Sequence, residues 1–155
     1  MPDAQSNNPY PPSAFYFKVM FGGTHETVDT SFQEVSGISS EVDVETVTEG
    51  GENRFVHQLP KGVKHSNLEL KRGIASKDSP LVKWCMAVME GDLVQAIETK
   101  EVRVFLLNEE KNPIRGWLFD SAYPLKWEVE SFGSTKNEVA IEKIVMSYTY
   151  SKRIV

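Results

Sequence analysis

Three histidines, one cysteine and a short acidic run are the side chains of this chain that could carry chemistry. His25, His57 and His65 could ligate a metal, but none stands at a short ligand spacing such as HxxxH, and no cysteine pair is present to complete a zinc site. Cys85 could act as a nucleophile only in a cationic, partly exposed setting. It falls on the apolar stripe of a predicted helix instead, which favours a buried, inert thiol.

Glu41, Asp43 and Glu45 could in principle supply a general acid and a general base. Their spacing of two places all three on one face of a strand, about 7 Å apart. That pattern favours an acid-lined surface over a catalytic pair.

The remaining patterns also lack the partners that catalysis needs. The glycines in FGG and EGG have neither the spacing nor the Lys-Ser/Thr of a phosphate loop, and no GxSxG motif occurs, so they are predicted to form turns. Lys71 and Arg72 lie on opposite faces of a strand, where each is expected to pair with a carboxylate. Because no nucleophile, base and orienting group come together, the sequence predicts a non-enzyme without metal or cofactor.

Strands are the main elements that must position these residues. Alternation of apolar and polar side chains, with many β-branched and aromatic residues, predicts strands in most of the chain. In residues 138–150 the first half could be helical, but the alternation that follows favours a strand. The segments with a strand pattern, of which seven or eight are expected to form strands, are residues 15–21, 31–36, 39–47, 54–59, 66–73, 100–108, 114–124, 124–132 and 138–150. Loops are predicted at 49–53, 59–65 and 133–137, and a hairpin turn at 108–113.

One helix is predicted over residues 80–90. Asp78 or Ser79 can cap its first turn, Pro80 suits that turn, and Gly91 can end it. Apolar side chains recur between them at helical spacing.

Length and composition are those of one globular domain. The chain has 155 residues, of which 40% are hydrophobic and 25% charged. Residues 1–13, rich in Pro, Asn and Ser, are expected to form a flexible arm, and residues 14–155 the domain. Seven or eight strands and one short helix predict a mainly β fold, an antiparallel β-sandwich or barrel with one flanking α-helix.

Charge and cysteine usage narrow the function classes. A formal net charge of −5 argues against a general binder of nucleic-acid backbones. A single cysteine is compatible with folding in a reducing cytoplasm, and neither a secretory signal nor a membrane span is recognised.

Five short motifs, in a fixed order, carry a resemblance to a known family. They are VSGI at 35–38, EGGEN at 49–53, LPKG at 59–62, LKRGI at 70–74 and NEVAIE at 137–142. In this order they resemble the tail tube proteins of contractile phages and of extracellular contractile injection systems, over about residues 14–153. Lys61 departs from the family pattern, which usually has Gly directly after the LP element.

The resemblance implies a structural subunit that joins six copies into a ring. Stacked rings would form a hollow inner tube that a contractile sheath drives through a target envelope, with baseplate and tube-terminating proteins as further partners. The cargo could be DNA or a protein effector. Alternatives are a specialised tube-initiating or adaptor ring at the baseplate end and a small-ligand-binding β-barrel. Assembly in the cytoplasm, and incorporation into a virion or released tail-like particle, are implied as well.

The same resemblance suggests roles for two groups of residues. Residues 48–62 are expected to reach over a neighbouring subunit, and Glu41, Asp43 and Glu45 are candidates for a lumen-facing stripe. A competing interpretation places these carboxylates at a contact between rings, opposite Lys or Arg. The candidate inter-subunit loop consists of Glu49, Gly50, Gly51, Glu52 and Asn53.

Overall fold

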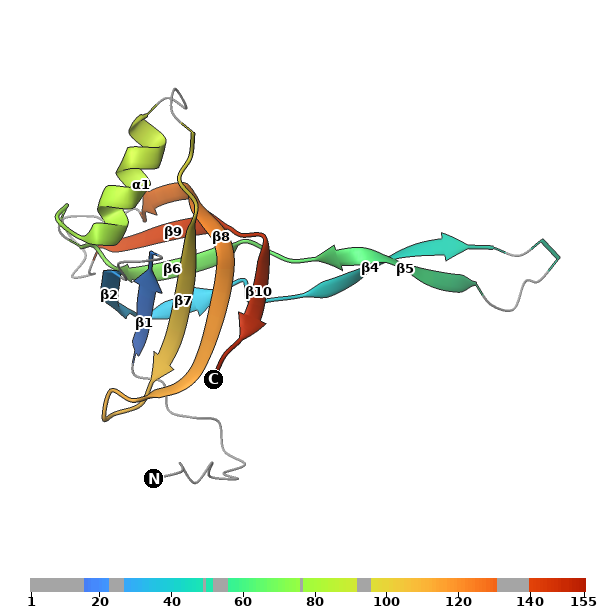
Figure 1. Cartoon of the computed structure of the whole chain (residues 1–155), viewed down its shortest axis with the longest axis horizontal. Helices are drawn as coiled ribbons and strands as arrows, with labels where there is room; N and C mark the ends of the chain where they lie inside the picture. Colours follow the sequence, from blue (N-terminus) through green and yellow to red (C-terminus); the bar gives the residue numbers. More distant parts are fainter. Residues whose placement is uncertain are drawn as a thin grey trace.

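The computed structural model describes residues 16–22, 27–48, 50–51, 56–75, 77–91, 96–130 and 140–155. The predicted arm, residues 1–13, lies outside this range. The described residues form one helix and ten strands, more strands than the seven or eight predicted (Figure 1). In chain order they are β1 (Tyr16–Phe21), β2 (Thr27–Phe32), β3 (Glu34–Ser36), β4 (Glu41–Val47), β5 (His57–Lys64), β6 (Leu68–Gly73), α1 (Pro80–Glu90), β7 (Lys100–Leu107), β8 (Pro113–Val129), β9 (Ile141–Ser147) and β10 (Tyr150–Arg153).

Eight of these strands form the antiparallel body of the domain, in the order β2-β1-β7-β8-β9-β6-β3, with β10 also paired to β8. The first part of β8 pairs with β7 and β10, and its last part pairs with β9. We call the strands before this crossing the β1 sheet (β2, β1, β7, β10 and the first part of β8). The β6 sheet consists of β3, β6, β9 and the last part of β8. The predicted mainly β, antiparallel fold is confirmed.

The hydrophobic core is formed by alternate residues of both sheets and by the helix. In β6 the burial alternates strictly, as the sequence predicts for a strand with one face against a core. Apolar side chains from the two sheets and α1 bury one another in a single cluster. Its members are Val19, Phe21, Phe32, Leu68, Leu70, Leu81, Trp84, Cys85, Val102, Val104, Phe119, Ala122, Ile144, Met146 and Tyr148.

Strand β8 is longer than predicted. The sequence suggests two strands, 114–124 and 124–132, but the structure has one strand of 17 residues. Ser121 has a positive φ of 51°, and the register with β9 shifts between Pro124 and Lys126. Such irregularities bend a strand without ending it, so β8 can serve both sheets.

The predicted strand at 31–36 is divided in two. It comprises the end of β2 and all of β3, interrupted at Gln33, whose backbone N–H donates to the carbonyl of Lys71 at 2.9 Å. Phe32, just before the break, is fully buried. The start of β2 was not predicted. Of β10, a short and largely exposed strand with two basic residues, the prediction included only Tyr150, as the end of the predicted strand 138–150.

Helix α1 has the predicted bounds and buries its apolar stripe. Leu81, Trp84 and Cys85 face the core, and Trp84 stacks on Phe21 with ring centroids 5.5 Å apart. Ser79 occupies the predicted cap position, but its hydroxyl makes no cap hydrogen bond. Gly91 follows the last turn with an ordinary negative φ of −75°.

The remaining two strands, β4 and β5, form a separate hairpin that projects far from the sandwich (Figure 1). The sequence predicted a loop at 59–65 because of Pro60 and Gly62, and this was wrong, since β5 runs through both. Each strand of a two-stranded ribbon has a free edge, where a proline lacking its N–H is tolerated. A register shift between Asp43 and Val44 accommodates the extra residue in β5.

Candidate assembly surfaces

One face of the projecting hairpin is apolar. Val42 lies opposite Val63, and Val44 lies opposite Pro60. Directly opposed residues of an antiparallel pair share a face, so these four form one patch, which we call the hairpin apolar face. Among the described residues this face stays largely exposed, with exposed fractions of 53% for Val42, 44% for Val44 and 72% for Val63.

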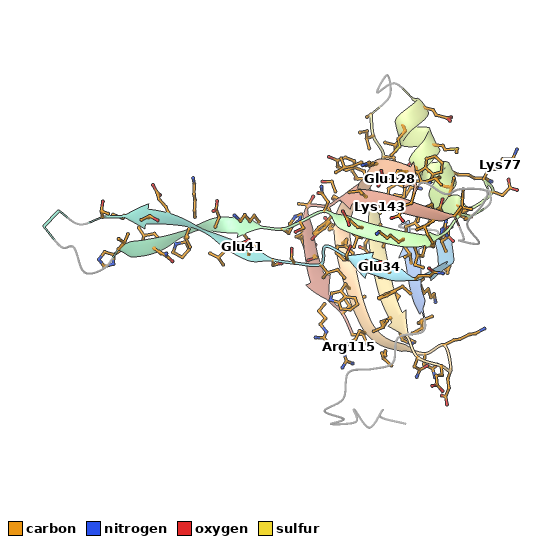
Figure 2. All side chains as sticks on the ribbon, turned by 180° about the vertical axis from the view of Figure 1, so that it is seen from behind. Glu34, Glu41, Lys77, Arg115, Glu128 and Lys143 are labelled. Atoms are coloured by element: carbon orange, nitrogen blue, oxygen red, sulfur yellow. The ribbon has the colours of Figure 1, made fainter. Side chains whose placement is uncertain are left out.

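The other face of the hairpin carries the predicted acidic residues. The Lys64 ammonium lies 4.0 Å from a Glu41 oxygen and 3.8 Å from an Asp43 oxygen, so both carboxylates point to the same side. Glu45 follows at the same two-residue spacing. The prediction that these carboxylates share a face is therefore confirmed. The sequence did not predict that β4 lies on a hairpin outside the sandwich (Figure 2).

The end of the hairpin contains the candidate inter-subunit loop. Gly51 has a positive φ of 92°, as expected for a glycine needed by the backbone. Gly50 does not share this conformation, and both glycines are exposed. Glu49, Glu52 and Asn53 lie outside the described residues.

The root of the hairpin is fastened to the sandwich at Gly37. This residue has a φ of 83°, and a Cβ placed on it would lie 1.9 Å from the backbone oxygen of Asn67. Nearby, the His65 ring stacks on the Tyr148 ring with their centroids 3.9 Å apart. The His65 Nε2 lies 3.2 Å from the carbonyl oxygen of Thr149. The VSGI motif is thus explained by a close contact between two backbones.

The outer face of the β6 sheet is covered with paired charges. A cross-strand row runs from Glu34 through Lys71 and Lys143 to Glu128, and Figure 2 labels three of these side chains. Adjacent lysines would repel each other, but carboxylates stand on both sides of them. We call this surface the charged face; it comprises Glu34, Glu69, Lys71, Lys126, Glu128, Glu130 and Lys143.

Each lysine of the charged face has a carboxylate partner on that face. The ammonium-to-carboxylate distances are 3.2 Å for Lys71–Glu130, 3.0 Å for Lys126–Glu128 and 3.6 Å for Lys143–Glu69. The hydrogen bond to Glu130 raises the pKa of Lys71, and the hydrogen bond from Lys126 lowers the pKa of Glu128. The charge of each lysine on the charged face is therefore balanced by a carboxylate of the same face.

The outer face of the β1 sheet differs in composition. A row across five strands runs through Val28, Met20, Arg103, Leu118 and Lys152. It holds three apolar side chains and two cations, of which Arg103 is ion-paired with Glu101 at 2.8 Å, and we call it the apolar-cationic face. Val28 is 44% exposed within the chain.

A buried ionic junction joins the two sheets to the helix. The Arg72 guanidinium donates through Nε to Glu142 at 2.5 Å and through its terminal nitrogens to Asp29 and to Ser79 Oγ. Trp127 Nε1 donates to the second Glu142 oxygen at 3.1 Å. The predicted pairing of Arg72 with a carboxylate is confirmed.

Asp29 provides the helix cap that Ser79 does not. One of its oxygens accepts hydrogen bonds from the Ser79 hydroxyl and, at 3.4 Å, from the backbone N–H of Leu81. A carboxylate at a helix N-terminus satisfies free N–H groups and favours the helix dipole. Sequence reasoning missed Asp29, because β2 was not predicted to begin before residue 31.

The residues first considered for chemistry are not brought together. Cys85 is buried, and desolvation raises the pKa of its thiol to about 12. Within the described residues no three His, Cys, Asp or Glu side chains form a group that could hold a metal ion, and His25 lies outside them. Nor does that part of the chain contain a helix of the length and apolarity that crossing a bilayer requires.

The class of protein that the structure defines is a β-sandwich with one flanking helix, a projecting hairpin and surfaces on which apolar side chains are exposed among the described residues. Residues 13–152 match the family described as T4-like virus tail tube protein gp19. The chain belongs to this family and is a structural tube subunit, as the resemblance of its motifs implied.

Solved structures agree with the family. The chain is 27% identical, with a TM-score of 0.79, to a chain in the cryo-EM structure of the anti-feeding prophage baseplate, 6-fold symmetrised, covering 94% of this chain and 96% of that one. A chain of the PVC sheath-tube complex of an extracellular contractile injection system is 21% identical, with a TM-score of 0.74 and coverages of 95% and 93%. Hcp1 from Flavobacterium johnsoniae shares the fold, with a TM-score of 0.54 and 15% identity over 90% of this chain and 94% of that one. No curated protein sequence matches the chain.

Proposed function

We propose that six copies of this chain close into a ring and that such rings stack into the inner tube of a contractile injection machine. The tube would be a hollow conduit for cargo, driven by a contractile sheath and bounded by baseplate and terminating proteins. Support comes from the similar chains, which belong to a 6-fold symmetrised baseplate, a sheath-tube complex and a tube-terminating cap. The subunit would be made and assembled in the cytoplasm and carried in a virion or tail-like particle.

The hairpin is the observation that carries this proposal. Val42, Val44 and Val63 lie on a ribbon that leaves the domain and are 44–72% exposed, and exposed apolar patches mark sites of association. The region 48–62 would reach over a neighbouring subunit, which covers the hairpin apolar face. Six copies related by rotation would each donate and receive such a hairpin.

Electron microscopy of the concentrated, purified protein tests the proposal, which expects rings or tubes. Val63→Asp should abolish them while leaving the thermal unfolding temperature of the subunit unchanged, because Val63 is 72% exposed. Ile97→Asp, at an apolar residue outside the hairpin that is 37% exposed, is the control and should still assemble. A wild-type protein that stays monomeric at every concentration would contradict the proposal.

The acidic stripe has two possible places in such a tube. Glu41, Asp43 and Glu45 either face the lumen or meet Lys or Arg of another copy. Their position on a projecting arm favours a contact between copies. Asp43→Lys distinguishes these roles: intact tubes with impaired delivery indicate the lumen, whereas loss of tubes indicates the contact.

An alternative position for the subunit is a specialised first ring at the baseplate end. The chain with 27% identity belongs to a baseplate structure, which favours this second candidate. Copy number separates the two, since a main tube subunit should be as abundant as the sheath protein in purified particles, and a first ring should contribute only a few copies.

We further propose that the subunit catalyses nothing. Membership of a structural tube family supports this, and no cofactor is needed for a rigid conduit. A small-ligand-binding barrel would behave differently, because it would stay monomeric and its ligand would raise its unfolding temperature.

A further inference from the structure

The root of the hairpin contains an imidazole that faces two hydrogen-bond acceptors. His65 Nδ1 lies 3.1 Å from the carbonyl oxygen of Ser66, and its Nε2 lies 3.2 Å from the carbonyl oxygen of Thr149. A carbonyl oxygen can only accept, so each contact is a hydrogen bond only when that ring nitrogen carries a proton. A neutral imidazole has one N–H and an imidazolium has two. The protonated ring therefore satisfies both contacts, and the neutral ring satisfies one of them.

The face of the ring adds a second preference for the charged form. The rings of His65 and Tyr148 are nearly parallel, at 11°, with their centroids 3.9 Å apart. A cation over the face of an aromatic ring is attracted by the ring quadrupole. Tyr148 is 4% exposed and packs edge-to-face on Phe119, so it holds a fixed position in the core. Burial raises the pKa of the Tyr148 phenol above its ordinary value of 10.0, which keeps this partner neutral.

These contacts connect the hairpin to the sandwich at the point where the two separate (Figure 1). His65 follows directly on β5, whereas Thr149 lies in the turn between β9 and β10. That turn is itself fixed, because the backbone N–H of Thr149 donates to the carbonyl of Asp120 at 2.9 Å. The His65 side chain therefore bears on the direction in which the hairpin leaves the sandwich.

The other ionisable groups at the root ordinarily titrate outside the range of an imidazole. On the strands that meet there they are Lys64, Glu69, Asp120, Tyr148, Tyr150, Lys152 and Arg153. Carboxylates, phenols, ammonium and guanidinium groups ordinarily change charge outside about pH 5–8, and an imidazole changes charge within it. The two carboxylates also have other partners, since Asp120 accepts a hydrogen bond from Ser121 and Glu69 accepts one from Ser36. Within the root, a pH response in this range therefore points to His65.

We infer that His65 is a proton-sensitive latch that holds the hairpin to the sandwich. When the ring is protonated, it donates to the carbonyls of Ser66 and Thr149 and the hairpin keeps one direction. Loss of the proton leaves one carbonyl without its donor and removes the cation from the face of Tyr148, so the direction of the hairpin varies more widely. The latch is a property of the single subunit and goes beyond the proposed function. In a tube it would preorganise the hairpin for its neighbour at acidic pH.

Nitrogen-15 NMR of the histidine side chains tests the protonation state directly. At about pH 5.5 His65 should show two ring N–H protons that exchange slowly with water, because both are hydrogen-bonded, and at about pH 8 it should show at most one. His65→Phe identifies the signals by their loss. His57, an exposed histidine of the hairpin, is the internal reference. If the ring protons of His65 exchange as fast as those of His57 at the acidic pH, the inference is overturned.

Spin-label distances test whether the hairpin changes direction. Labels on Gln58→Cys, in the hairpin, and Lys152→Cys, in β10, report the separation of the two parts, and Cys85 is only 1% exposed and stays unlabelled. Mixing labelled chains into an excess of unlabelled ones restricts the signal to distances within one subunit, whether free or assembled. The distance distribution should be about twofold broader at about pH 8 than at about pH 5.5.

Two histidine variants make this measurement specific. His65→Phe retains a ring on Tyr148 but has no N–H, so its distribution should be broad at both pH values. His57→Phe is the matched control and should narrow at acidic pH as the wild type does. Equal widths at the two pH values in the wild type, or the same narrowing in His65→Phe, would overturn the inference. If His65→Phe does not fold, the ring protons and the distances of the wild-type histidine still decide the outcome.

Discussion

The Arg72 guanidinium lies 2.5 Å from the Glu142 carboxylate, and both side chains are almost fully buried, with exposed fractions of 3% and 1%. Arg72 belongs to β6 and Glu142 to β9. Through Asp29 and Ser79 the same guanidinium also reaches β2 and the start of α1. This junction fixes the helix on the sandwich, and it gives the LKRGI and NEVAIE motifs one shared physical role.

Replacing Arg72 with Met should destabilise the subunit by roughly 3–5 kcal/mol, because it removes the guanidinium that pairs with the buried Glu142 and the partly buried Asp29. Urea unfolding measures the loss. Lys71→Met is the matched control at the adjacent position: its partner Glu130 is exposed, so its cost should be far smaller than that of Arg72→Met. Equal losses for the two variants would show that the junction does not stabilise the fold.

The sequence predicts the elements of this junction better than its contacts. Alternation places Lys71 and Arg72 on opposite faces, and periodicity defines α1, because both patterns are local. The partner Glu142 is 70 residues away, and Asp29 is 43 residues away. Which strand lies beside which depends on the packing of the whole sandwich, so a single sequence predicts that Arg72 needs a carboxylate without identifying it.

Gly37→Ala should destabilise the subunit strongly. The residue has a positive φ, and the added methyl would collide with the backbone oxygen of Asn67 at the root of the hairpin. Backbone strain of this kind costs about 1–3 kcal/mol, and relief of the collision adds to it. Chemical denaturation of the purified variant measures the effect.

Gly62→Ala provides the control for that measurement. No atom lies within 4 Å of a Cβ built on Gly62, which stands in the hairpin itself. Its free energy of unfolding should stay within about 0.5 kcal/mol of wild type. If Gly37→Ala were equally mild, the close approach of the two backbones would not be a constraint on the fold.

The candidate surfaces were only partly predictable. The two-residue period of β4 correctly placed Glu41, Asp43 and Glu45 on one face, but the same period normally means that the opposite face is buried. Here Val42 and Val44 are exposed, because β4 pairs only with β5 and leaves the sandwich. The charged face left a visible signal, the alternating Glu and Lys of three strands, but its continuity depends on their register.

Cys85 should be unreactive toward a disulfide reagent in the native subunit. Its pKa of about 12 leaves roughly one thiol in ten thousand ionised at pH 8, and the side chain is buried beside the core. The reaction should proceed at the rate of a free thiol once the protein is unfolded in urea. Rapid reaction of the folded protein would contradict the burial of this helix face.

The paired charges of the β6 sheet should make the free energy of unfolding depend on pH in the acidic range where carboxylates titrate. The pKa of Glu128 is lowered from 4.5, chiefly by the hydrogen bond from Lys126. A carboxyl whose pKa is lowered on folding stabilises the native protein when the pH is above its pKa in the unfolded chain. This contribution disappears as the pH falls through its pKa in the folded protein. Because both groups are exposed, the effect should be small and should shrink in high salt.

Glu128→Gln isolates that contribution. Urea midpoints of the wild-type and variant subunits, measured from about pH 6 down to about pH 3, should converge as the pH falls, since protonation removes from the wild type what the substitution has already removed. A constant difference between the two midpoints over this range would mean that the Glu128 carboxylate gains nothing from Lys126. Lys71 contributes in a different pH range. Because its pKa is raised, it stabilises the native state when the pH is below its ordinary pKa of 10.5, and this contribution is lost as the pH rises through its pKa in the folded protein.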